Sequence, residues 1–285
     1  MRKLYKLFKV LLSKIEVKIR SFLAEKIHLP IEKPDSVYLN ISNKCNFRCK
    51  MCDQWEMGKT EDPNKYLTMG QLKLFIDQLS SWGIKSFGIS GGETLLWKNK
   101  ILQLLEYANK KKMYTHFVTN GFLLNQEVIE SYDKIGGGHI SMSLDAASTL
   151  HDQLRGQQGA YDGVQRAIQV FKKSKPKNIL LKINLVITNK NLDEILNVVE
   201  ICRKNNLSLF VQPFDPYNWD NRKQLTLDQY RELYPLWISK DNEQKMIQVI
   251  KILLEFKKRE PSLILNSVQH LKAIPNYFQI GRAHV

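Results

Sequence analysis

The chain contains few cysteines: there are four in 285 residues, and three of them lie between positions 45 and 52. A disulfide framework spreads an even number of cysteines through a small secreted domain, and this pattern does not fit one. No small-residue cleavage site follows the N-terminal stretch, so we expect no cleavable signal peptide. These absences indicate the reducing cytosol as the compartment.

Long hydrophobic runs and acidic residues are also scarce. No run of about 18 uninterrupted apolar residues occurs, so we expect no membrane-spanning helix. Lysine and arginine outnumber aspartate and glutamate by 43 to 28, which gives a net charge of +15. This balance favours an anionic partner, such as nucleic acid, lipid head groups or an acidic substrate, or else marks a solvated lysine-rich surface. Because no stacking motif or basic–aromatic interleaving occurs, we do not expect nucleic acid as a partner.

Residues 1–26 place apolar side chains at helical spacing, for example Leu4, Leu7 and Leu11, with lysines and arginines on the opposite face. The pattern predicts a basic amphipathic helix that can make peripheral contact with an anionic membrane surface. A helix that packs on the main domain and shows its lysines to water gives the same pattern. With the proline-containing linker that follows, this helix makes up residues 1–34.

From residue 35 the chain alternates short β-rich runs with helical patterns. Predicted strands cover residues 37–42, 86–89, 114–119, 139–143, 179–187 and 208–212. Predicted helices cover residues 69–82, 98–112, 126–134, 160–173 and 193–205. Six β/α units in series imply an α/β fold with a parallel sheet, either doubly wound or curled into a barrel. In such sheets the chemistry lies in the loops that follow the carboxyl ends of the strands.

The region of residues 35–225 is followed by a longer helical pattern. This pattern runs from about 226 to 258, and we assign residues 226–279 to a C-terminal helical segment. The last six residues, IGRAHV (280–285), match the translation of a common sequencing adapter. We therefore expect the authentic part of this sequence to end near Gln279, where the natural chain would be cut short; an ordinary C-terminus is the alternative.

The three clustered cysteines have the spacing C-x₃-C-x₂-C and come just after the first predicted strand. A structural zinc site requires four ligands, and no fourth cysteine or histidine lies nearby in the sequence. Cys202 falls in a helical pattern and is expected to be a small buried core residue. Three thiolates leave one iron of a [4Fe–4S] cluster without a protein ligand, and an open metal position can bind a small molecule.

The segment CNFRCKMC resembles the cluster motif of the radical S-adenosylmethionine (radical SAM) superfamily. The resemblance implies a partial (β/α)₆ TIM-like barrel in which Cys45, Cys49 and Cys52 hold a [4Fe–4S] cluster. The open iron would chelate the amino and carboxylate groups of S-adenosylmethionine. The reduced cluster would then cleave this cofactor to a 5′-deoxyadenosyl radical, which abstracts hydrogen from a substrate. Met51 stands where many members carry an aromatic residue.

Two glycine-containing motifs support the resemblance. SGGET (90–94) directly follows the second predicted strand and resembles the GGE element of the superfamily. In that element the backbone of Gly91 and Gly92 would meet the amino group of S-adenosylmethionine, and Glu93 would shape the loop; a plain turn is the alternative. After the third strand, VTNG (118–121) resembles a common TNG element, with Asn120 as a polar contact or as part of an Asn-Gly turn.

The fourth predicted strand ends in SMSLDA, and HDQLRG follows. This pairing resembles the branch that includes the enzymes of PQQ and molybdenum-cofactor biosynthesis and SPASM-type peptide-modifying enzymes. By that resemblance, Ser143 and Arg155 hold the carboxylate of S-adenosylmethionine, since arginine suits bidentate carboxylate binding. Asp145 lies on the same strand face as Ser143 or else caps a helix. We expect His151 to be a surface helix residue.

Further polar residues follow the last two strands. Asn184 interrupts the apolar fifth strand and needs a hydrogen-bond partner, for which the ribose of S-adenosylmethionine is a candidate. Gln212 and the loop after it lie where a substrate would enter. Asp215, Tyr217 and Trp219 are candidates for substrate contact, and a plain exposed loop is the alternative.

The sequence thus predicts a radical SAM enzyme with a [4Fe–4S] cluster and S-adenosylmethionine as cofactors. The branch suggests a peptide or protein substrate, and an electron donor such as flavodoxin or ferredoxin. The N-terminal helix prompts an alternative, a lipid or sugar substrate at the inner face of the membrane. A second alternative is a non-catalytic iron–sulfur or zinc-binding module. LKAIPNYFQ resembles the lead-in to an auxiliary-cluster extension, whose cysteines this sequence does not contain.

Overall fold

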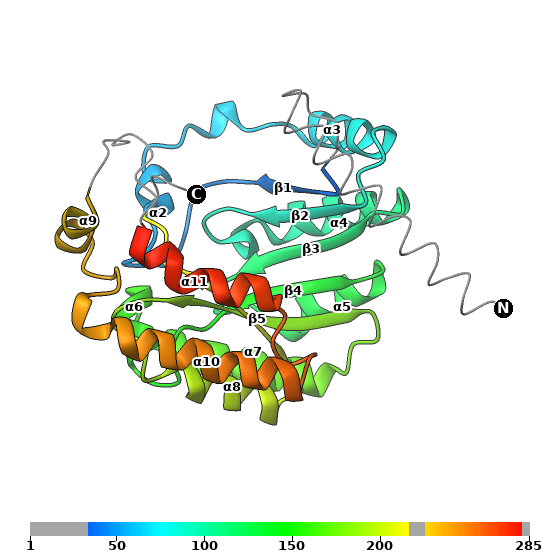
Figure 1. Ribbon diagram of the computed structural model, residues 1–285. Helices are drawn as coiled ribbons and strands as arrows, with labels where there is room; N and C mark the ends of the chain where they lie inside the picture. Colours follow the sequence, from blue (N-terminus) through cyan, green and yellow to red (C-terminus); the bar gives the residue numbers. More distant parts are fainter. Residues whose placement is uncertain (1–33, 217–225, 281–285) are drawn as a thin grey trace, which may run out of the picture.

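The computed structural model describes residues 34–216 and 226–280 (Figure 1). Within them one six-stranded, all-parallel sheet has its strands in sequence order. The strands are β1 (Ser36–Asn40), β2 (Ser86–Ser90), β3 (Tyr114–Thr119), β4 (Gly138–Ser143), β5 (Ile179–Ile187) and β6 (Ser208–Pro213). The predicted α/β fold with six parallel strands is confirmed. The sheet does not close, because β1 and β6 are not paired with one another.

The helices of the described ranges connect successive strands or follow β6 (Figure 1). They are α2 (Gln54–Met57), α3 (Met69–Ser81), α4 (Lys98–Lys110), α5 (Gln126–Lys134), α6 (Leu150–Arg155), α7 (Ala160–Ser174), α8 (Ile195–Lys204), α9 (Leu227–Leu233), α10 (Glu243–Arg259) and α11 (Val268–Ile280). None of the helices in the described ranges is long and apolar enough to cross a membrane. The predictions for residues 1–26, Tyr217, Trp219 and 281–285 fall outside the described residues.

Local sequence signals start several of these elements. Thr68 begins α3 with a capping box: its hydroxyl accepts from the Gln71 amide at 3.3 Å, and the Gln71 side chain accepts from the Thr68 amide at 2.9 Å. Thr226 and Gln229 repeat this arrangement at α9. The paired bonds satisfy amides that have no partner inside the helix.

Successive side chains of each strand point alternately to the helix-packed core and to the concave face of the sheet. In β5, Ile183, Leu185 and Ile187 are fully buried, whereas Asn184 and Val186 line a cavity. Successive side chains in a strand point to opposite faces, so one face packs on the helices and the other faces inward. The polar residues that the sequence singled out therefore share the concave side.

The predicted continuous helix over 226–258 is wrong. The chain forms α9, breaks at Tyr234 and resumes a helix at Glu243. Pro235 stands at the break, where a proline removes a backbone donor and restricts the residue before it. Trp237, just beyond, is buried, and its indole N–H donates to the Phe278 carbonyl of α11 at 3.1 Å. Burial of the segment after the break outweighs helical continuity.

The chain between α10 and α11 lies along the free edge of β6. Leu209 donates to the Leu263 carbonyl at 2.7 Å and accepts from the Leu265 amide at 2.8 Å. The Asn266 side chain pairs with both backbone groups of Val211 at 2.7 and 2.9 Å. These bonds satisfy backbone groups that an edge strand leaves open, and they direct α11 along β6 toward the carboxyl ends of the strands.

Two histidines stack inside the concave side of the sheet. The rings of His116 on β3 and His139 on β4 lie 4.4 Å apart and within 8° of parallel. The Nε2 atoms of both rings are buried without a hydrogen-bond partner. Burial lowers the pKa of His116 to about 4 and that of His139 to about 3, and the nearby Lys182 ammonium adds to both shifts. Both rings are therefore neutral at pH 7.

This pair predicts a pH dependence of folding stability. Unfolded histidine titrates near about 6.5, so at lower pH the unfolded chain binds protons that the folded chain excludes. The stabilisation is complete above that pH and is lost as the pH falls toward 4. When the pH is lowered from 7 to 5, the free energy of unfolding of the wild type should fall by about 2 kcal/mol more than that of His116→Leu. Urea unfolding at pH 7 and pH 5 measures both free energies. If they fall equally in the two proteins, His116 is not held as a neutral, buried ring in the folded state.

Candidate active site

The cysteine loop follows β1 and is anchored by one aromatic residue. Phe47 is 1% exposed and packs edge-to-face on Phe122, with ring centroids 5.6 Å apart. The Lys50 amide donates to the Leu154 carbonyl of α6 at 2.9 Å, which ties the loop to the neighbouring β/α unit. An apolar anchor and a backbone bond thus fix the loop that carries the three thiols.

The three thiols are partly buried and uncharged in the absence of a metal. Burial raises the pKa of Cys45 to about 11 and also raises the pKa of Cys49 and Cys52. Among the described residues, no three cysteine, histidine or acidic side chains form a group that could hold one metal ion. Each cysteine of a [4Fe–4S] cluster binds a different iron, so that cluster does not need the thiols to converge as zinc does. Cys202 is fully buried in α8, as the sequence predicted.

Gly91 and Gly92 bring the cysteine loop against the end of β2. Gly92 donates to the Ser42 carbonyl at 2.8 Å, and the next residue, Glu93, donates to the Lys44 carbonyl at 2.9 Å. A Cβ at either glycine would collide with one of these carbonyls, and Gly91 has a φ of +138° that favours glycine. The glycines are therefore required by the cysteine loop itself, besides lining the cavity.

We expect Gly92→Ala to displace the cysteine loop, because the new Cβ has no space beside the Lys44 carbonyl. Overpacking of this kind costs about 1–3 kcal/mol, and we expect less iron bound per chain after reconstitution. Gly70→Ala is the matched control, since its Cβ meets nothing closer than 4.0 Å. Thermal unfolding and iron content measure both effects. Equal behaviour of the two variants would contradict the close packing at Gly92.

Glu93 is a buried carboxylate that holds the glycine turn and the following strand end together. It accepts from the Leu95 amide at 2.9 Å, the Thr119 hydroxyl at 2.7 Å and the Asn120 amide at 2.7 Å. Burial raises the pKa of the Glu93 carboxyl, while these three donors oppose the shift. This geometry agrees with the expected loop-shaping role for Glu93.

Asn120 joins the third strand end to the cysteine loop. Its side-chain amide donates to Asn46 Oδ1 at 2.8 Å, and its side-chain oxygen accepts from the Phe122 amide at 3.0 Å. Gly121 has a φ of +83°, so the Asn-Gly turn is present as well. The predicted Asn-Gly turn is therefore present, and contact between Asn120 and S-adenosylmethionine stays a prediction for a residue that lines the cavity.

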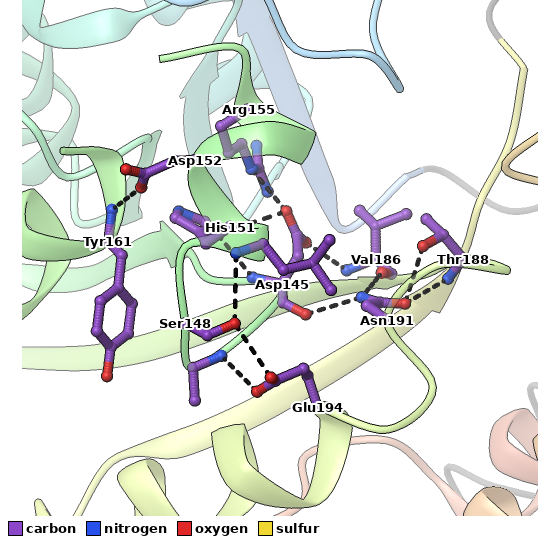
Figure 2. A network of polar contacts seen from close by, with 12 residues as sticks. Asp145, Ser148, His151, Asp152, Arg155, Tyr161, Val186, Thr188, Asn191 and Glu194 are labelled. Carbon is purple, nitrogen blue, oxygen red and sulfur yellow. Dashed lines mark hydrogen bonds and ion pairs between the residues drawn. The ribbon is translucent and has the colours of Figure 1, made fainter. Parts of the chain in front are cut away.

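A buried ion pair follows β4 (Figure 2). Asp145 is fully buried, and its carboxylate accepts from Arg155 Nε at 2.6 Å and from the Val186 amide at 2.9 Å. Burial disfavours the charge on Arg155, but Asp145 and Cys49 beside the guanidinium raise its pKa. Asp145 does not cap α6, whose N-cap is Thr149, so the helix-cap interpretation is wrong. Asp145 instead fixes Arg155 beside a thiol of the cysteine loop.

His151 is fully buried, and its prediction as a surface residue is wrong. Its Nδ1 accepts from the Asp145 amide at 3.1 Å, and burial lowers the pKa of the ring to about 4. The HDQLRG pattern placed this residue on a short helix but gave no sign that the helix turns it inward. The neutral imidazole fixes the backbone of the Asp145 turn.

Asn191 and Glu194 support the same turn and were missed in the sequence. The Asn191 amide donates to the Asp145 and Val186 carbonyls, both at 2.8 Å. Glu194 accepts from the Ser148 hydroxyl at 3.0 Å (Figure 2). Asn191 lies in the TNKN stretch directly after β5, and its position after a strand end was the available signal.

A cavity of about 520 Å³ opens at the carboxyl ends of the strands. Its lining includes Cys45, Cys49, Met51, Cys52, Gln54, Trp55, Ser90, Gly91, Gly92, Val118, Thr119, Asn120, Ser143, Arg155, Asn184, Val186, Gln212, Pro213, Phe214, Asp215 and Tyr277. The structure thus brings together the residues predicted for the cluster and for S-adenosylmethionine except Glu93, which is buried and does not line the cavity; of the predicted substrate contacts, Asp215 lines it, and Tyr217 and Trp219 lie outside the described residues. Tyr277 comes from α11 and donates to Asp215 Oδ1 at 2.9 Å at one side of the cavity. The sequence did not single out Tyr277.

The cavity combines three thiols, one guanidinium and several neutral polar side chains. Its volume is in the range of small-molecule and cofactor sites, and it lies where parallel α/β sheets bind ligands. The arrangement can hold an iron–sulfur cluster and, beside it, a small molecule with a carboxylate. It defines a metal- and cofactor-binding protein of the parallel β/α class.

The chain belongs to the radical SAM superfamily, whose family model matches residues 39–202. Similar proteins include an AdoMet-dependent heme synthase of Methanosarcina barkeri, 28% identical over 60% of this chain and 48% of its own length. The sporulation killing factor maturation protein SkfB of Bacillus subtilis is 28% identical over 62% of this chain and 42% of its own length. The chain therefore spans less than half of these relatives.

The fold also matches a solved structure. Streptococcus suis SuiB bound to S-adenosylmethionine superposes with a TM-score of 0.63 and 18% sequence identity, over 87% of this chain and 53% of SuiB. At that identity the likeness shows the fold alone. Members of the superfamily use a [4Fe–4S] cluster and S-adenosylmethionine.

The residues present fit both groups. Three thiols on one loop supply the cluster ligands, and the donor set lacks the fourth ligand of a closed structural site. The cavity beside them holds a guanidinium and strand-end polar groups that suit an amino acid moiety and a ribose. The cluster and S-adenosylmethionine thus have a place that this chain's own residues provide.

Proposed function

We propose that this protein is a radical SAM enzyme that cleaves S-adenosylmethionine reductively and abstracts hydrogen from a peptide or protein substrate. The observation that carries the proposal is the opening of all three thiols and the polar strand ends into one cavity. When bound, the cluster supplies one electron to the sulfonium of S-adenosylmethionine, which separates into methionine and the 5′-deoxyadenosyl radical.

The chain's own residues bind and orient the cofactor. Arg155, fixed by Asp145, presents a cation for the carboxylate of S-adenosylmethionine, and Ser143 offers a hydroxyl on the neighbouring strand end. The backbone of Gly91 and Gly92 would meet the amino group of the cofactor. Asn184, on β5, would bind its ribose, and Cys45, Cys49 and Cys52 would hold the cluster irons.

Arg155 is shared between the cofactor and the cysteine loop. Its guanidinium lies close enough to Cys49 for its charge to oppose the rise in the pKa of that thiol caused by burial. A cation beside a thiol favours the thiolate, which is the form that binds a metal. The same side chain therefore positions S-adenosylmethionine and favours the ligand form of Cys49.

Two kinds of support favour a peptide or protein substrate. The relative SkfB is named as a maturation protein, and SuiB has been solved with its precursor peptide SuiA. In this chain Asp215 and Tyr277 add a hydrogen-bonding pair to the cavity wall, from segments outside the family match. The carboxylate and the phenol oxygen at that position can accept hydrogen bonds from peptide N–H groups.

Deuterium transfer tests the substrate class. The reconstituted protein is incubated with S-adenosylmethionine, dithionite and a pool of peptides made from fully deuterated amino acids. We expect deuterium in the 5′-deoxyadenosine that forms, because the radical takes hydrogen from the substrate. 5′-Deoxyadenosine without deuterium above the solvent background would reject peptides from this pool as substrates while leaving the cofactor chemistry intact.

Residues 1–26 suggest a cytosolic protein that contacts the inner face of the membrane, with a lipid or sugar substrate as the second candidate. The basis is the basic amphipathic pattern of this segment. Binding to vesicles rich in anionic lipid, with and without residues 1–26, tests the contact. Loss of binding on deletion supports it, and undiminished binding rejects it.

A further inference from the structure

One carboxylate outside the cavity holds the start of the cysteine loop. Glu61 lies between α2 and α3, and its side chain reaches the two residues that follow Ile41 after β1. Glu61 Oε2 accepts from the Ser42 hydroxyl at 2.6 Å, and the Asn43 amide donates to both carboxylate oxygens at 3.1 Å. Glu61 does not line the cavity, so it acts on the site through these residues.

The Glu61 side chain is held in its charged form by its donors. The Tyr66 hydroxyl donates to Glu61 Oε2 at 2.8 Å, beside the bonds from Ser42 and Asn43. Burial raises the pKa of the Glu61 carboxyl, but these three donors outweigh burial and leave the pKa below its usual value. Hydrogen bonds to a charged acceptor are stronger than bonds between neutral groups. The carboxylate therefore fixes this stretch of backbone more firmly than a neutral side chain would.

The same connection makes a second close contact with this backbone. Gly58 directly follows α2, and a Cβ there would lie 2.5 Å from the Asn43 carbonyl oxygen and 2.8 Å from the Lys44 amide nitrogen. The turn after α2 therefore packs against the residues that Glu61 binds. One polar contact and one steric contact fix residues 42–44 from the same side.

Residues 42–44 in turn hold the glycine turn that follows β2. The Ser42 carbonyl accepts from the Gly92 amide at 2.8 Å, and the Lys44 carbonyl accepts from the Glu93 amide at 2.9 Å. The Ser42 hydroxyl, which donates to Glu61, also accepts from the Lys44 amide at 3.1 Å. A continuous set of hydrogen bonds therefore connects Glu61 with the backbone of the glycine turn.

We propose that Glu61 is a positioning residue for S-adenosylmethionine, because it fixes residues 42–44 and, through them, the turn at Gly92 that would receive the amino group of the cofactor. The inference rests on the proposed function, which places S-adenosylmethionine at this turn. The thiols have anchors of their own in Phe47 and the Lys50 amide. Cofactor binding therefore depends on Glu61 more than cluster binding does. Residues that orient a ligand group from behind typically contribute about 10–100-fold to affinity or activity.

Amide hydrogen exchange in the metal-free chain tests the positioning directly. Glu61→Gln keeps the size of the side chain but replaces one acceptor oxygen by an NH₂ donor. We expect the Gly92 and Glu93 amides to exchange about tenfold faster in this variant than in the wild type, while the amides of β4 stay unchanged. Glu106→Gln is the matched control, because Glu106 pairs with Lys110 on the surface of α4, and it should exchange like the wild type.

Titration of the reconstituted proteins with S-adenosylmethionine separates positioning from a purely structural role. We expect Glu61→Gln to take up as much iron as the wild type but to bind S-adenosylmethionine about tenfold more weakly. Glu106→Gln should match the wild type in both measurements. A side chain that only stabilises the cysteine loop would lower iron uptake together with cofactor affinity.

Three results would overturn the proposal: unchanged exchange at Gly92 and Glu93, equal affinity of Glu61→Gln and the wild type for S-adenosylmethionine, or a parallel loss of iron uptake in the variant. If the wild type takes up the cluster but does not bind or cleave S-adenosylmethionine, the proposed function fails. The exchange measurement then still decides whether Glu61 fixes the glycine turn, since it uses the metal-free chain.

Discussion

Replacing Cys45, Cys49 and Cys52 together by alanine is expected to abolish cluster binding while leaving the fold intact. The three thiols lie on a loop whose anchors, Phe47 and the Lys50 amide, do not involve sulfur. The wild type should take up about four irons and four sulfides per chain on anaerobic reconstitution, and the triple variant close to none. Iron and sulfide analysis with visible absorbance measures the difference.

The fourth cysteine provides the matched control. Cys202 is fully buried in α8 and far along the sequence from the loop, and Cys202→Ala should keep full cluster uptake. A modest loss of stability is expected for this variant, because a small buried group is removed. Cluster uptake by the triple variant, or its loss in Cys202→Ala, would show that the three loop cysteines are not the ligands.

Asp145→Ala is expected to have the largest effect on stability. Asp145 is fully buried and Arg155 is 11% exposed, so the substitution leaves a buried guanidinium without its partner. Breaking such a pair costs about 3–5 kcal/mol. Asp145→Asn keeps an oxygen for the Val186 amide and should cost less. Denaturant unfolding of the metal-free chain gives both values.

An exposed ion pair serves as the comparison. Glu200 lies 3.1 Å from Arg203 on the surface of α8, and Glu200→Ala should change the unfolding free energy by less than about 1 kcal/mol. Binding of S-adenosylmethionine should weaken in both Asp145 variants and stay unchanged in Glu200→Ala. If Asp145→Ala is as stable as Glu200→Ala, the pair with Arg155 does not hold the site together.

The strand order and the strand-end positions of the site could be predicted because they depend on local patterns. Alternating runs with glycine or polar residues at their ends specify a parallel sheet, and parallel strands bring those ends to one edge. Cys45, Gly91, Ser143 and Asn184 are far apart in the sequence, yet they line one cavity for this reason.

The partners of buried polar groups could not be predicted in the same way. His151 belongs to a polar stretch, and only the packing of α6 turns it under the Asp145 backbone. Gly91 and Gly92 indicated that another group approaches their backbone closely, but not that this group is the backbone of the cysteine loop. Such pairings depend on the relative placement of two elements, which periodicity along one element does not encode.

The C-terminal segment shows the same limit. Its helical periodicity was correct for α10, but Pro235 and the burial of Trp237 break the pattern before it. The return along β6 that delivers Tyr277 to the cavity depends on the Asn266 side chain replacing strand bonds. Nothing in the composition indicates that the Asn266 side-chain amide takes the hydrogen bonds that a neighbouring strand would make with β6.

Cleavage of S-adenosylmethionine by one-electron reduction is the reaction that we propose for this chain. 5′-Deoxyadenosine formation by the anaerobically reconstituted protein with dithionite and S-adenosylmethionine, beside the triple cysteine variant, tests it directly. We predict 5′-deoxyadenosine and methionine in equal amounts from the wild type and neither from the variant. A wild type that binds a full cluster and S-adenosylmethionine yet forms no 5′-deoxyadenosine would contradict the claim.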